Sequence, residues 1–165
     1  MNRPNQIEIN VFSLKYQKDV IDLIVGIQQK EFGIAITAQD QPDLGNIPSF
    51  YQKENGNFWV AVFNEKVIGT ISLLDIGNRQ AALRKMFVNN TFRGQKFKIA
   101  PMLLETLFDW ARSVGLKEIY LGTTPKFIAA HRFYEKNDFE EIAKESLPTA
   151  FPIMSVDTKF YKYEI

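Results

Sequence analysis

The sequence contains no cysteine and only one histidine, His131. The lack of cysteine excludes a disulfide framework, a thiolate metal site, an iron–sulfur cluster and a cysteine nucleophile. A zinc site built on paired histidines is also excluded, and a Ser-His-Asp triad would have to use His131. The chain has neither a Gly-x-Ser-x-Gly elbow nor a Gly-Lys-Ser/Thr phosphate loop. We therefore expect no metal site and no catalysis by a cysteine nucleophile.

Neither sign of charge dominates, since 20 lysines and arginines accompany 19 aspartates and glutamates for a net charge of +1. A chain-wide field that attracts nucleic acid or a membrane surface is therefore not expected. No apolar run approaches the roughly 18 residues of a membrane span, and the polar segment Met1–Glu8 does not resemble a signal peptide. We expect a cytoplasmic protein in which residues 1–165 form a single domain.

Apolar residues make up 45% of the chain and recur at spacings that predict regular elements. Alternation and short apolar runs predict strands, and spacing of three to four residues predicts helices. Gly33 and Gly115 are expected to stop two helices, whereas Thr124 and Pro125 are expected to open one as N-cap and first residue. The predicted strands are 7–11, 58–63, 67–74, 81–88, 117–121, 139–143 and 153–163, and the predicted helices are 17–32, 97–114 and 124–136. With residues 37–57 as loop or short helix, the order β-α-loop-β-β-β-α-β-α-β-β predicts an α+β, or mixed α/β, sheet protein.

The segment Leu83–Ala100 runs from a strand through a polar loop into a helix. The first turn of a helix presents unpaired backbone N–H groups at the positive end of its dipole, which is a common phosphate site. Arg93, Lys96 and Lys98 add positive charge to this loop. Taken alone, the three cations are more typical of a solvated loop than of a phosphate site.

A second segment, Ala129–Phe139, makes the pattern specific. In order and spacing the two segments resemble the GNAT superfamily of N-acetyltransferases. Residues Arg93–Lys98 correspond to its Arg/Gln-x-x-Gly-x-Gly/Ala acyl-CoA loop, and Phe133–Phe139 to its Phe-Tyr-x-Lys-x-Gly-Phe block. The element order is also that of the superfamily, so the resemblance extends over residues 7–165. It implies a central, mostly antiparallel sheet flanked by helices.

The resemblance implies an acyltransferase that moves the acetyl group of acetyl-CoA to an amine by direct attack. Tyr134 would be the general acid that protonates the departing thiolate, because a phenol of pKa near 10 suits a thiol of pKa near ~8.5. Backbone groups of Met86–Val88 would meet the pantetheine and thioester, and those of Arg93–Ile99 the pyrophosphate. The residues that the resemblance assigns to acyl-CoA binding are Met86, Phe87, Val88, Arg93, Gly94, Gln95, Lys96, Phe97, Lys98, Ile99, Phe133, Tyr134 and Lys136.

Three positions depart from the family pattern, since Lys96, Lys98 and Asp138 stand where the family has glycine. Glycine is required only where φ is positive or where a Cβ does not fit. If φ is ordinary at Lys96 and Lys98, both side chains add charge beside the phosphates; if it is not, CoA affinity suffers. Asp138 is compatible with a left-handed turn, which Asp tolerates better than most residues.

The general base is open on the sequence alone. The strand 81–88 has no carboxylate, so Glu31, Asp75 and the loop residues Asp40 and Asp43 are the candidates, with Glu31 taken forward; a water chain would need none. His131 lies one helical turn before Tyr134, and we expect it to be solvent-exposed.

Two other classes compete with the enzyme. A CoA-binding sensor with weak or no catalysis would fit the altered glycines, and nucleic-acid binding through the basic loop would need more phosphate contacts than three cations provide. The acceptor is expected to be a small-molecule or peptide amine, lying against residues 28–51 and 147–154. Glu31, Asp40 and Asp43 in this region suggest a cationic amine. The sequence does not distinguish a monomer from a homodimer.

Overall fold

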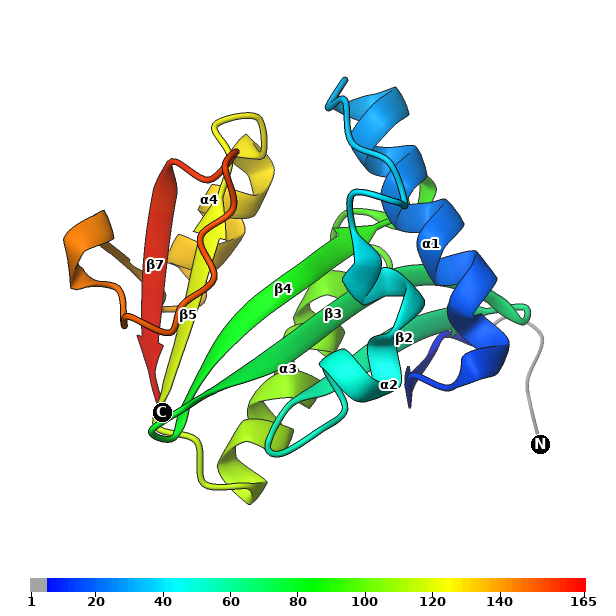
Figure 1. Ribbon diagram of the computed structural model, residues 1–165. Coiled ribbons are helices and arrows are strands. Elements are labelled where there is room, and N and C mark those ends of the chain that lie inside the picture. The colour runs from blue at the N-terminus through cyan, green and yellow to red at the C-terminus, as the bar shows by residue number, and fades with distance from the viewer. Residues whose placement is uncertain (1–5) are drawn as a thin grey trace.

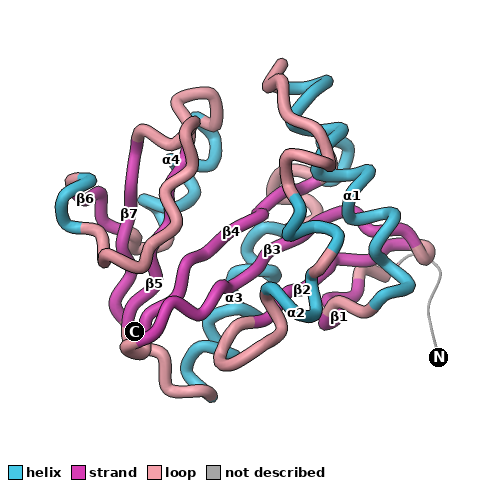
Figure 2. Tube along the Cα trace, viewed as in Figure 1, coloured by secondary structure: helices cyan, strands magenta, loops and turns pink. Residues whose placement is uncertain are grey.

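The structure is a computed structural model that describes residues 6–165, so the first part of the polar N-terminal segment lies outside the described residues. Its strands are β1 (Glu8–Val11), β2 (Asn57–Phe63), β3 (Lys66–Gly77), β4 (Gln80–Val88), β5 (Glu118–Thr123), β6 (Glu140–Ile142) and β7 (Lys159–Glu164). Its helices are α1 (Gln17–Gly26), α2 (Ile47–Phe50), α3 (Ile99–Ser113) and α4 (Ile128–Lys136). The predicted order of elements and the mixed α/β class are confirmed (Figure 2).

The seven strands form one sheet in the order β1-β2-β3-β4-β5-β7-β6. Neighbouring strands are antiparallel except for β4 and β5, which are parallel. The β4–β5 pairing is short and extends from Gln80–Glu118 to Ala82–Tyr120. Beyond that point the two strands diverge, as Figure 1 shows, so that the sheet opens into a V at its centre.

Alternating residues of β2 explain why helices cover both faces of the sheet. Phe58 and Val60 pack with Val20 and Ile24 of α1. Trp59 and Ala61 point the other way, into a cluster that includes Leu103 and Leu107 of α3. A strand with period-two side chains that is apolar on both faces needs a layer on each side. In Figure 1, α1 and α2 accordingly lie on one face and α3 on the other.

The first helix changes character before it ends. The expected helix 17–32 is α-helical to Gly26 and continues as a π-helical segment, Ile27–Glu31, before Gly33 stops it at a φ of 62°. A π-turn widens the helix and re-aims the side chains that follow, and it is frequent at functional sites. Here it points Gln28 inward, where its side chain is buried.

Two expected boundaries were wrong. The fourth helix begins at Ile128 rather than Thr124, because residues 124–127 form a separate turn closed by the Phe127 N–H and the Thr124 carbonyl at 3.2 Å. That carbonyl also contacts Nε2 of His131 at 2.9 Å, which leaves His131 half-buried instead of exposed.

The last strand begins at Lys159 rather than at residue 153. The preceding residues turn back, since the Asp157 N–H donates to the Met154 carbonyl at 3.0 Å and the Met154 N–H donates to Oδ2 of Asp157 at 3.3 Å. The apolar alternation in this segment therefore does not produce a strand. No helix among residues 6–165 is long and apolar enough to cross a membrane.

Candidate functional site

The divergence of β4 and β5 leaves a cavity of about 520 Å³ between them. The walls include Leu83–Val88 of β4 and Leu121–Thr123 of β5, with the first turns of α4, the π-helical segment and residues 151–157 around them. A concave site where neighbouring strands separate, apolar with a few polar groups, is the usual form of a ligand pocket. We take this cavity as the candidate active site.

A β-bulge shapes the β4 wall. Thr70 pairs with Phe87 and Ser72 pairs with Arg84, so that Lys85 and Met86 together oppose one residue of β3. Lys85 has a positive φ of 55°. The hydroxyl of Thr70 donates to the Lys85 carbonyl at 2.7 Å, and that of Ser72 donates to the Arg84 carbonyl at 2.6 Å. Two buried hydroxyls thus hold the irregular backbone in place.

The bulge also changes which side chains face the same way. In a regular strand, consecutive residues point to opposite faces. Here the guanidinium of Arg84 lies over the ring of Tyr51, and the ammonium of Lys85 lies 3.7 Å from Asp43, whose carboxylate accepts a hydrogen bond from the Tyr51 hydroxyl. Both cations therefore lie on the α2 side of the sheet, whereas Met86 faces α4.

Tyr134 lies on α4 with its phenol in the cavity wall. Its side chain is only 6% exposed, and its hydroxyl donates to Sδ of Met86 at 3.7 Å. Burial raises the pKa of the phenol well above its usual value. The group stays protonated through the physiological range, so it can donate a proton into the cavity.

The backbone conformation of the loop before α3 shows which of the substituted family glycines lie at a positive φ. Gly94 has a φ of 102° and lines the cavity, whereas Lys96 has an ordinary φ. Lys98, the N-cap of α3, is left-handed with a φ of 54°. Asp138 has a φ of 70°, so the expected left-handed turn is confirmed. Two of the three substituted family glycines therefore stand where glycine is conformationally favoured.

The structure brings together seven of the thirteen residues that the resemblance assigned to acyl-CoA. Those that line the cavity are Met86, Phe87, Val88, Arg93, Gly94, Phe133 and Tyr134. Those outside the cavity lining are Gln95, Lys96, Phe97, Lys98, Ile99 and Lys136. Most of this second group precede or open α3, where a phosphate would meet backbone N–H groups outside the cavity itself.

Glu31, the sequence-based candidate for the base, lies outside the cavity lining. Its carboxylate accepts two hydrogen bonds from the Arg93 guanidinium, one of them 2.8 Å long between Nη2 and Oε2. The same arginine donates through Nε to the Val88 carbonyl at 2.8 Å. Glu31 and Arg93 thus hold the end of the π-helical segment against the end of β4.

The other carboxylates considered for the base have structural partners. Asp40 accepts hydrogen bonds from the backbone and hydroxyl of Thr37, and Asp75 accepts from the backbone of Asn55 and Gly77. Asp43 is buried against Tyr51, with a 2.6 Å hydrogen bond between the hydroxyl and Oδ2. The suggestion that Asp40 and Asp43 select a cationic amine therefore finds no support in their contacts.

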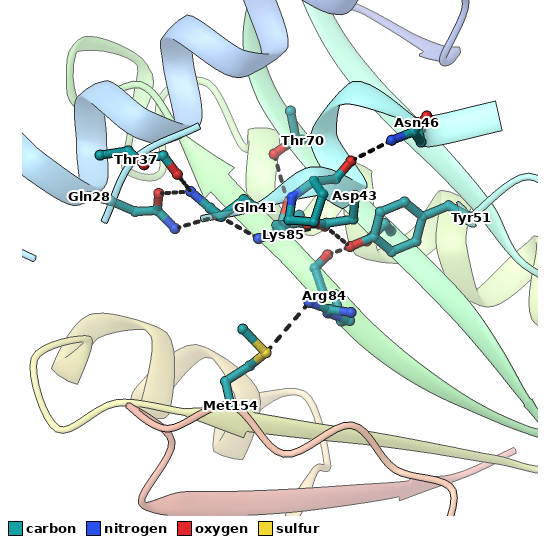
Figure 3. Close-up of polar contacts among 12 residues, drawn as sticks. Gln28, Thr37, Gln41, Asp43, Asn46, Tyr51, Thr70, Arg84, Lys85 and Met154 are labelled. Carbon is teal, nitrogen blue, oxygen red and sulfur yellow. Dashed lines mark hydrogen bonds and ion pairs between the residues drawn. The ribbon is translucent and has the colours of Figure 1, made fainter. Parts of the chain in front are cut away.

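A buried polar cluster that sequence reasoning missed lies beside the cavity (Figure 3). The side-chain amides of Gln28 and Gln41 donate to each other at 3.1 and 2.8 Å, and Lys85 donates to Oε1 of Gln41 at 2.5 Å. Burial lowers the pKa of Lys85 to about 8, while the carboxylate of Asp43 works against that change. The signal in the sequence was the pair Arg84-Lys85 in an otherwise apolar strand.

Asp157 is the second functional candidate that the sequence did not reveal. It lines the cavity, and burial raises the pKa of its carboxyl group, while Arg84 and Lys85 work in the opposite direction. Gly122 of β5 makes room for it, because a Cβ at that position would lie 2.6 Å from Oδ2 of Asp157. The local signal was weak, since residues 153–163 read as a strand.

Comparison with protein families and curated proteins gives a consistent result. A family model described as the acetyltransferase (GNAT) family matches residues 22–139. An N-acetylaspartate synthetase of Xenopus tropicalis is 36% identical over 104 residues, which are 61% of this chain and 37% of the relative. N-acetyltransferase 8B of Homo sapiens is 28% identical over 129 residues, or 74% of this chain and 56% of the relative. The chain thus spans between a third and somewhat more than half of these relatives.

Solved structures match over nearly the whole chain. An acetyltransferase of the GNAT family from Staphylococcus aureus Mu50 has a TM-score of 0.92 at 39% identity, covering 96% of this chain and 99% of that one. The PaiA N-acetyltransferase of Thermoplasma acidophilum, solved in complex with coenzyme A, has a TM-score of 0.74 at 17% identity, covering 97% of this chain and 99% of that one. Because the identity to the Thermoplasma acidophilum protein is only 17%, this similarity shows a shared fold and nothing further.

Proposed function

Because the chain belongs to the acetyltransferase (GNAT) family, and is thus a GNAT-family N-acetyltransferase, we propose that it moves the acetyl group of acetyl-CoA to a primary amine by direct attack. The observation that carries this mechanism is the buried phenol of Tyr134 in the wall of the β4–β5 cavity. No protein nucleophile is needed, which suits a chain without cysteine.

The residues around the cavity fit an acyl-CoA. Met86, Val88 and Phe133 give the part beside Tyr134 an apolar wall suited to a pantetheine arm. Arg93 and Gly94 lie at one end of the same cavity, next to the loop that leads into α3. A Cβ at Gly94 would meet no atom within 4 Å, so the loop is open at this point. Backbone N–H groups at the start of α3 would hold the phosphates.

Tyr134 has one task in the reaction. The acceptor nitrogen forms a bond to the thioester carbonyl carbon, the carbon–sulfur bond breaks, and the thiolate takes the phenolic proton. The nitrogen gives up a proton as the amide forms, which restores the phenol. Burial raises the pKa of Tyr134 and so makes it a weaker acid, and the role therefore rests on the position of the hydroxyl in the cavity wall. Glu31 as the base stays a prediction from the sequence, and its contacts with Arg93 do not support that role.

Two measurements test the function. Isothermal titration with acetyl-CoA should show binding, and incubation with acetyl-CoA and a panel of amines should release CoA in an acceptor-dependent way. Binding without release on any acceptor would favour the CoA-sensor alternative. The absence of both would overturn the proposed function.

A further inference from the structure

Arg84 and Asp157 carry opposite charges and line the cavity, and Lys126 is a further charged residue of the lining that forms no ion pair among residues 6–165. The guanidinium of Arg84 donates to Sδ of Met154 at 3.8 Å and lies over the rings of Phe50 and Tyr51, at 5.6 and 5.8 Å. Asp157 accepts a hydrogen bond from the Met154 backbone. Among residues 6–165, neither group lies within 4.0 Å of a side chain of opposite charge. Met154 contacts Arg84 through its sulfur and Asp157 through its backbone N–H, and the charge of Arg84 acts on the carboxyl group of Asp157.

Arg84 is the cation of the β4 wall that forms no ion pair within 4.0 Å among residues 6–165, whereas Lys126, which follows β5 in the sequence, donates to the Phe32 carbonyl at 3.2 Å. The bulge in β4 places it on the same face as Lys85, but the two side chains differ in their partners. Lys85 is buried with Asp43 and Gln41, whereas Arg84 meets a thioether and aromatic rings. A guanidinium in a partly desolvated wall costs free energy unless an anion meets it. A bound carboxylate would match its planar donors in bidentate fashion.

Asp157 offers the complementary charge. Gly122 on β5 leaves the space that its carboxylate fills, and the turn at residues 154–157 holds it there. Burial raises the pKa of its carboxyl group, which makes it a stronger proton acceptor than an exposed aspartate. A primary ammonium group is the natural partner for such a carboxylate.

Resting on the proposed N-acetyltransferase function, we propose that the acceptor is an amino-carboxylate, a small molecule whose carboxylate binds Arg84 and whose amino group meets Asp157. Asp157 takes one proton from the ammonium and passes it to water, which frees the lone pair. The nitrogen then bonds to the thioester carbon, the carbon–sulfur bond breaks, and the thiolate takes the proton of Tyr134. The nitrogen loses its second proton to the phenolate, and the products are the N-acetyl amino acid and CoA.

The test compares amino acids with their amides, which lack the carboxylate charge, and with spermidine, a polyamine without a carboxylate. A panel of L-amino acids, the amides of the same amino acids, and spermidine is incubated with acetyl-CoA, and CoA release and product mass are measured. We expect the acids to be acetylated and their amides to show kcat/KM lower by about 10-fold or more, as for loss of a charge-assisted hydrogen bond.

Variants then assign the preference to residues. Arg84→Gln should lower kcat/KM for the acids by about 10- to 100-fold and leave the amides nearly unchanged, so that the difference between them disappears. Arg84→Lys should retain part of the preference for acids over amides, because its side chain keeps the positive charge. Arg112→Gln, an exposed arginine of α3, is the matched control and should retain the wild-type preference. Asp157→Asn should lower kcat for acids and amides alike and remove the acid limb of the pH profile.

Each outcome decides the inference separately from the proposed function. Acetylation of spermidine or of the amides as efficiently as the acids, or an unchanged acid preference in Arg84→Gln, would overturn the acceptor class while the acetyltransferase function stands. Failure of every carboxylated probe to react or bind, while acetyl-CoA still binds, would also overturn it. Loss of acetyl-CoA binding in the wild type, or acetyl-CoA binding without CoA release on any acceptor of the panel, counts against the function itself.

Discussion

Tyr134 illustrates how surroundings set the chemistry of one residue. A half-buried helical tyrosine is usually a packing residue, and Tyr134 does pack against Phe139 and Tyr161. Its hydroxyl, however, points at Met86 in the cavity wall, and burial raises the pKa of the phenol. The fold thus combines packing of the ring with a protonated hydroxyl at the place where a thiolate would leave.

Replacing Tyr134 with Phe should therefore lower kcat by about 100- to 10,000-fold, as for loss of a general acid. The affinity for acetyl-CoA should change little, because the ring remains. The control is Tyr163→Phe. The ring of Tyr163 packs on Phe108 outside the cavity lining, so the loss of its hydroxyl should not affect turnover. Wild-type turnover in Tyr134→Phe, with chemistry rate-limiting, would reduce Tyr134 to a packing residue.

Lys98 and Lys96 differ in backbone conformation, and this difference predicts opposite effects of the same substitution. A non-glycine residue in the left-handed region costs roughly 1 kcal/mol, and Lys98 has a φ of 54°. Lys98→Gly should therefore stabilise the protein by up to about 1 kcal/mol, while Lys96→Gly, at an ordinary φ, should destabilise it by a similar amount. Urea unfolding measures both variants. Equal effects of the same sign would contradict the argument.

Whether these two lysines also anchor CoA phosphates stays a prediction. The ammonium of Lys96 lies over the ring of Phe97 at 5.3 Å, and both lysines are exposed. Alanine and glycine variants of both lysines separate the effect of the side chain on CoA affinity from that of the backbone. A side-chain anchor is lost in both kinds of variant, whereas backbone strain at Lys98 is relieved only by glycine.

At the scale of elements, the bulge in β4 is the feature on which the site depends. The buried hydroxyl of Thr70 donates a hydrogen bond to the Lys85 carbonyl at 2.7 Å, at the position where the bulge interrupts the pairing of β3 with β4. Thr70→Val keeps the shape but leaves a buried carbonyl without this partner, so the free energy of unfolding should fall by about 1–3 kcal/mol.

Thr106→Val is the control for this substitution. The Thr106 hydroxyl donates to the Met102 carbonyl within α3, which already belongs to the helix ladder. Chemical denaturation should show a change well below 1 kcal/mol for Thr106→Val. Similar losses in both variants would mean that the hydroxyl of Thr70 has no special role at the bulge.

The elements themselves could largely be predicted from sequence, because each depends on local periodicity. The hairpin of β2 and β3 and the apolar face of α3 follow from residues close in the chain. The predicted start of α4 was wrong because Thr124-Pro125 suits both a helix start and a separate turn, and the contact of the Thr124 carbonyl with the His131 side chain, seven residues later, favours the turn.

The site was harder to predict than the elements, because it depends on contacts between residues that are far apart in the chain. Tyr134 and the loop of Arg93 were found through a resemblance, whereas Arg84, Lys85 and Asp157 acquire their roles from distant partners. Lys85 meets Gln41 and Asp43 from more than forty residues away, and Arg84 meets Met154 from seventy residues away. No local pattern in the sequence encodes such pairings. The bulge that brings the two cations to one face is likewise a property of the assembled sheet.

At the scale of the whole molecule, burial of Lys85 should give stability a distinct dependence on pH. The pKa of Lys85 is about 8 in the folded state and 10.5 in the unfolded chain, where its neighbours Asp43, Arg84 and Asp157 no longer act on it. Between these values the unfolded chain binds more protons, so this group makes the folded state more stable as pH rises.

Relative to Lys85→Met, the wild type should therefore gain about 2–3 kcal/mol in free energy of unfolding as the pH rises from 8 to 10.5. Urea unfolding of both proteins across this range measures the difference. Well below pH 8 the difference should be constant, because Lys85 is then charged in both states. A difference that is flat over the whole range would show that Lys85 is not desolvated in the folded protein.

The two halves of the sheet are joined at its centre by the short β4–β5 pairing and by the apolar cluster behind it. A ligand in the cavity would touch both strands, so its binding should stabilise the molecule as a whole and not one half of it. Acetyl-CoA at about 100 times its dissociation constant should add roughly 2.7 kcal/mol to the free energy of unfolding. For a chain of this size that corresponds to a rise in Tm of about 5–10 °C.

Differential scanning calorimetry with and without acetyl-CoA measures this rise, and the transition should remain single. Adenosine triphosphate, which has phosphates but no pantetheine, is the matched control and should raise the Tm much less, because only the loop before α3 would hold it. An equal rise with both compounds would show that the cavity between β4 and β5 takes no part in binding. Two separate transitions, with only one of them shifted by acetyl-CoA, would show that the strands on either side of the V unfold independently, which the shared apolar cluster makes unfavourable.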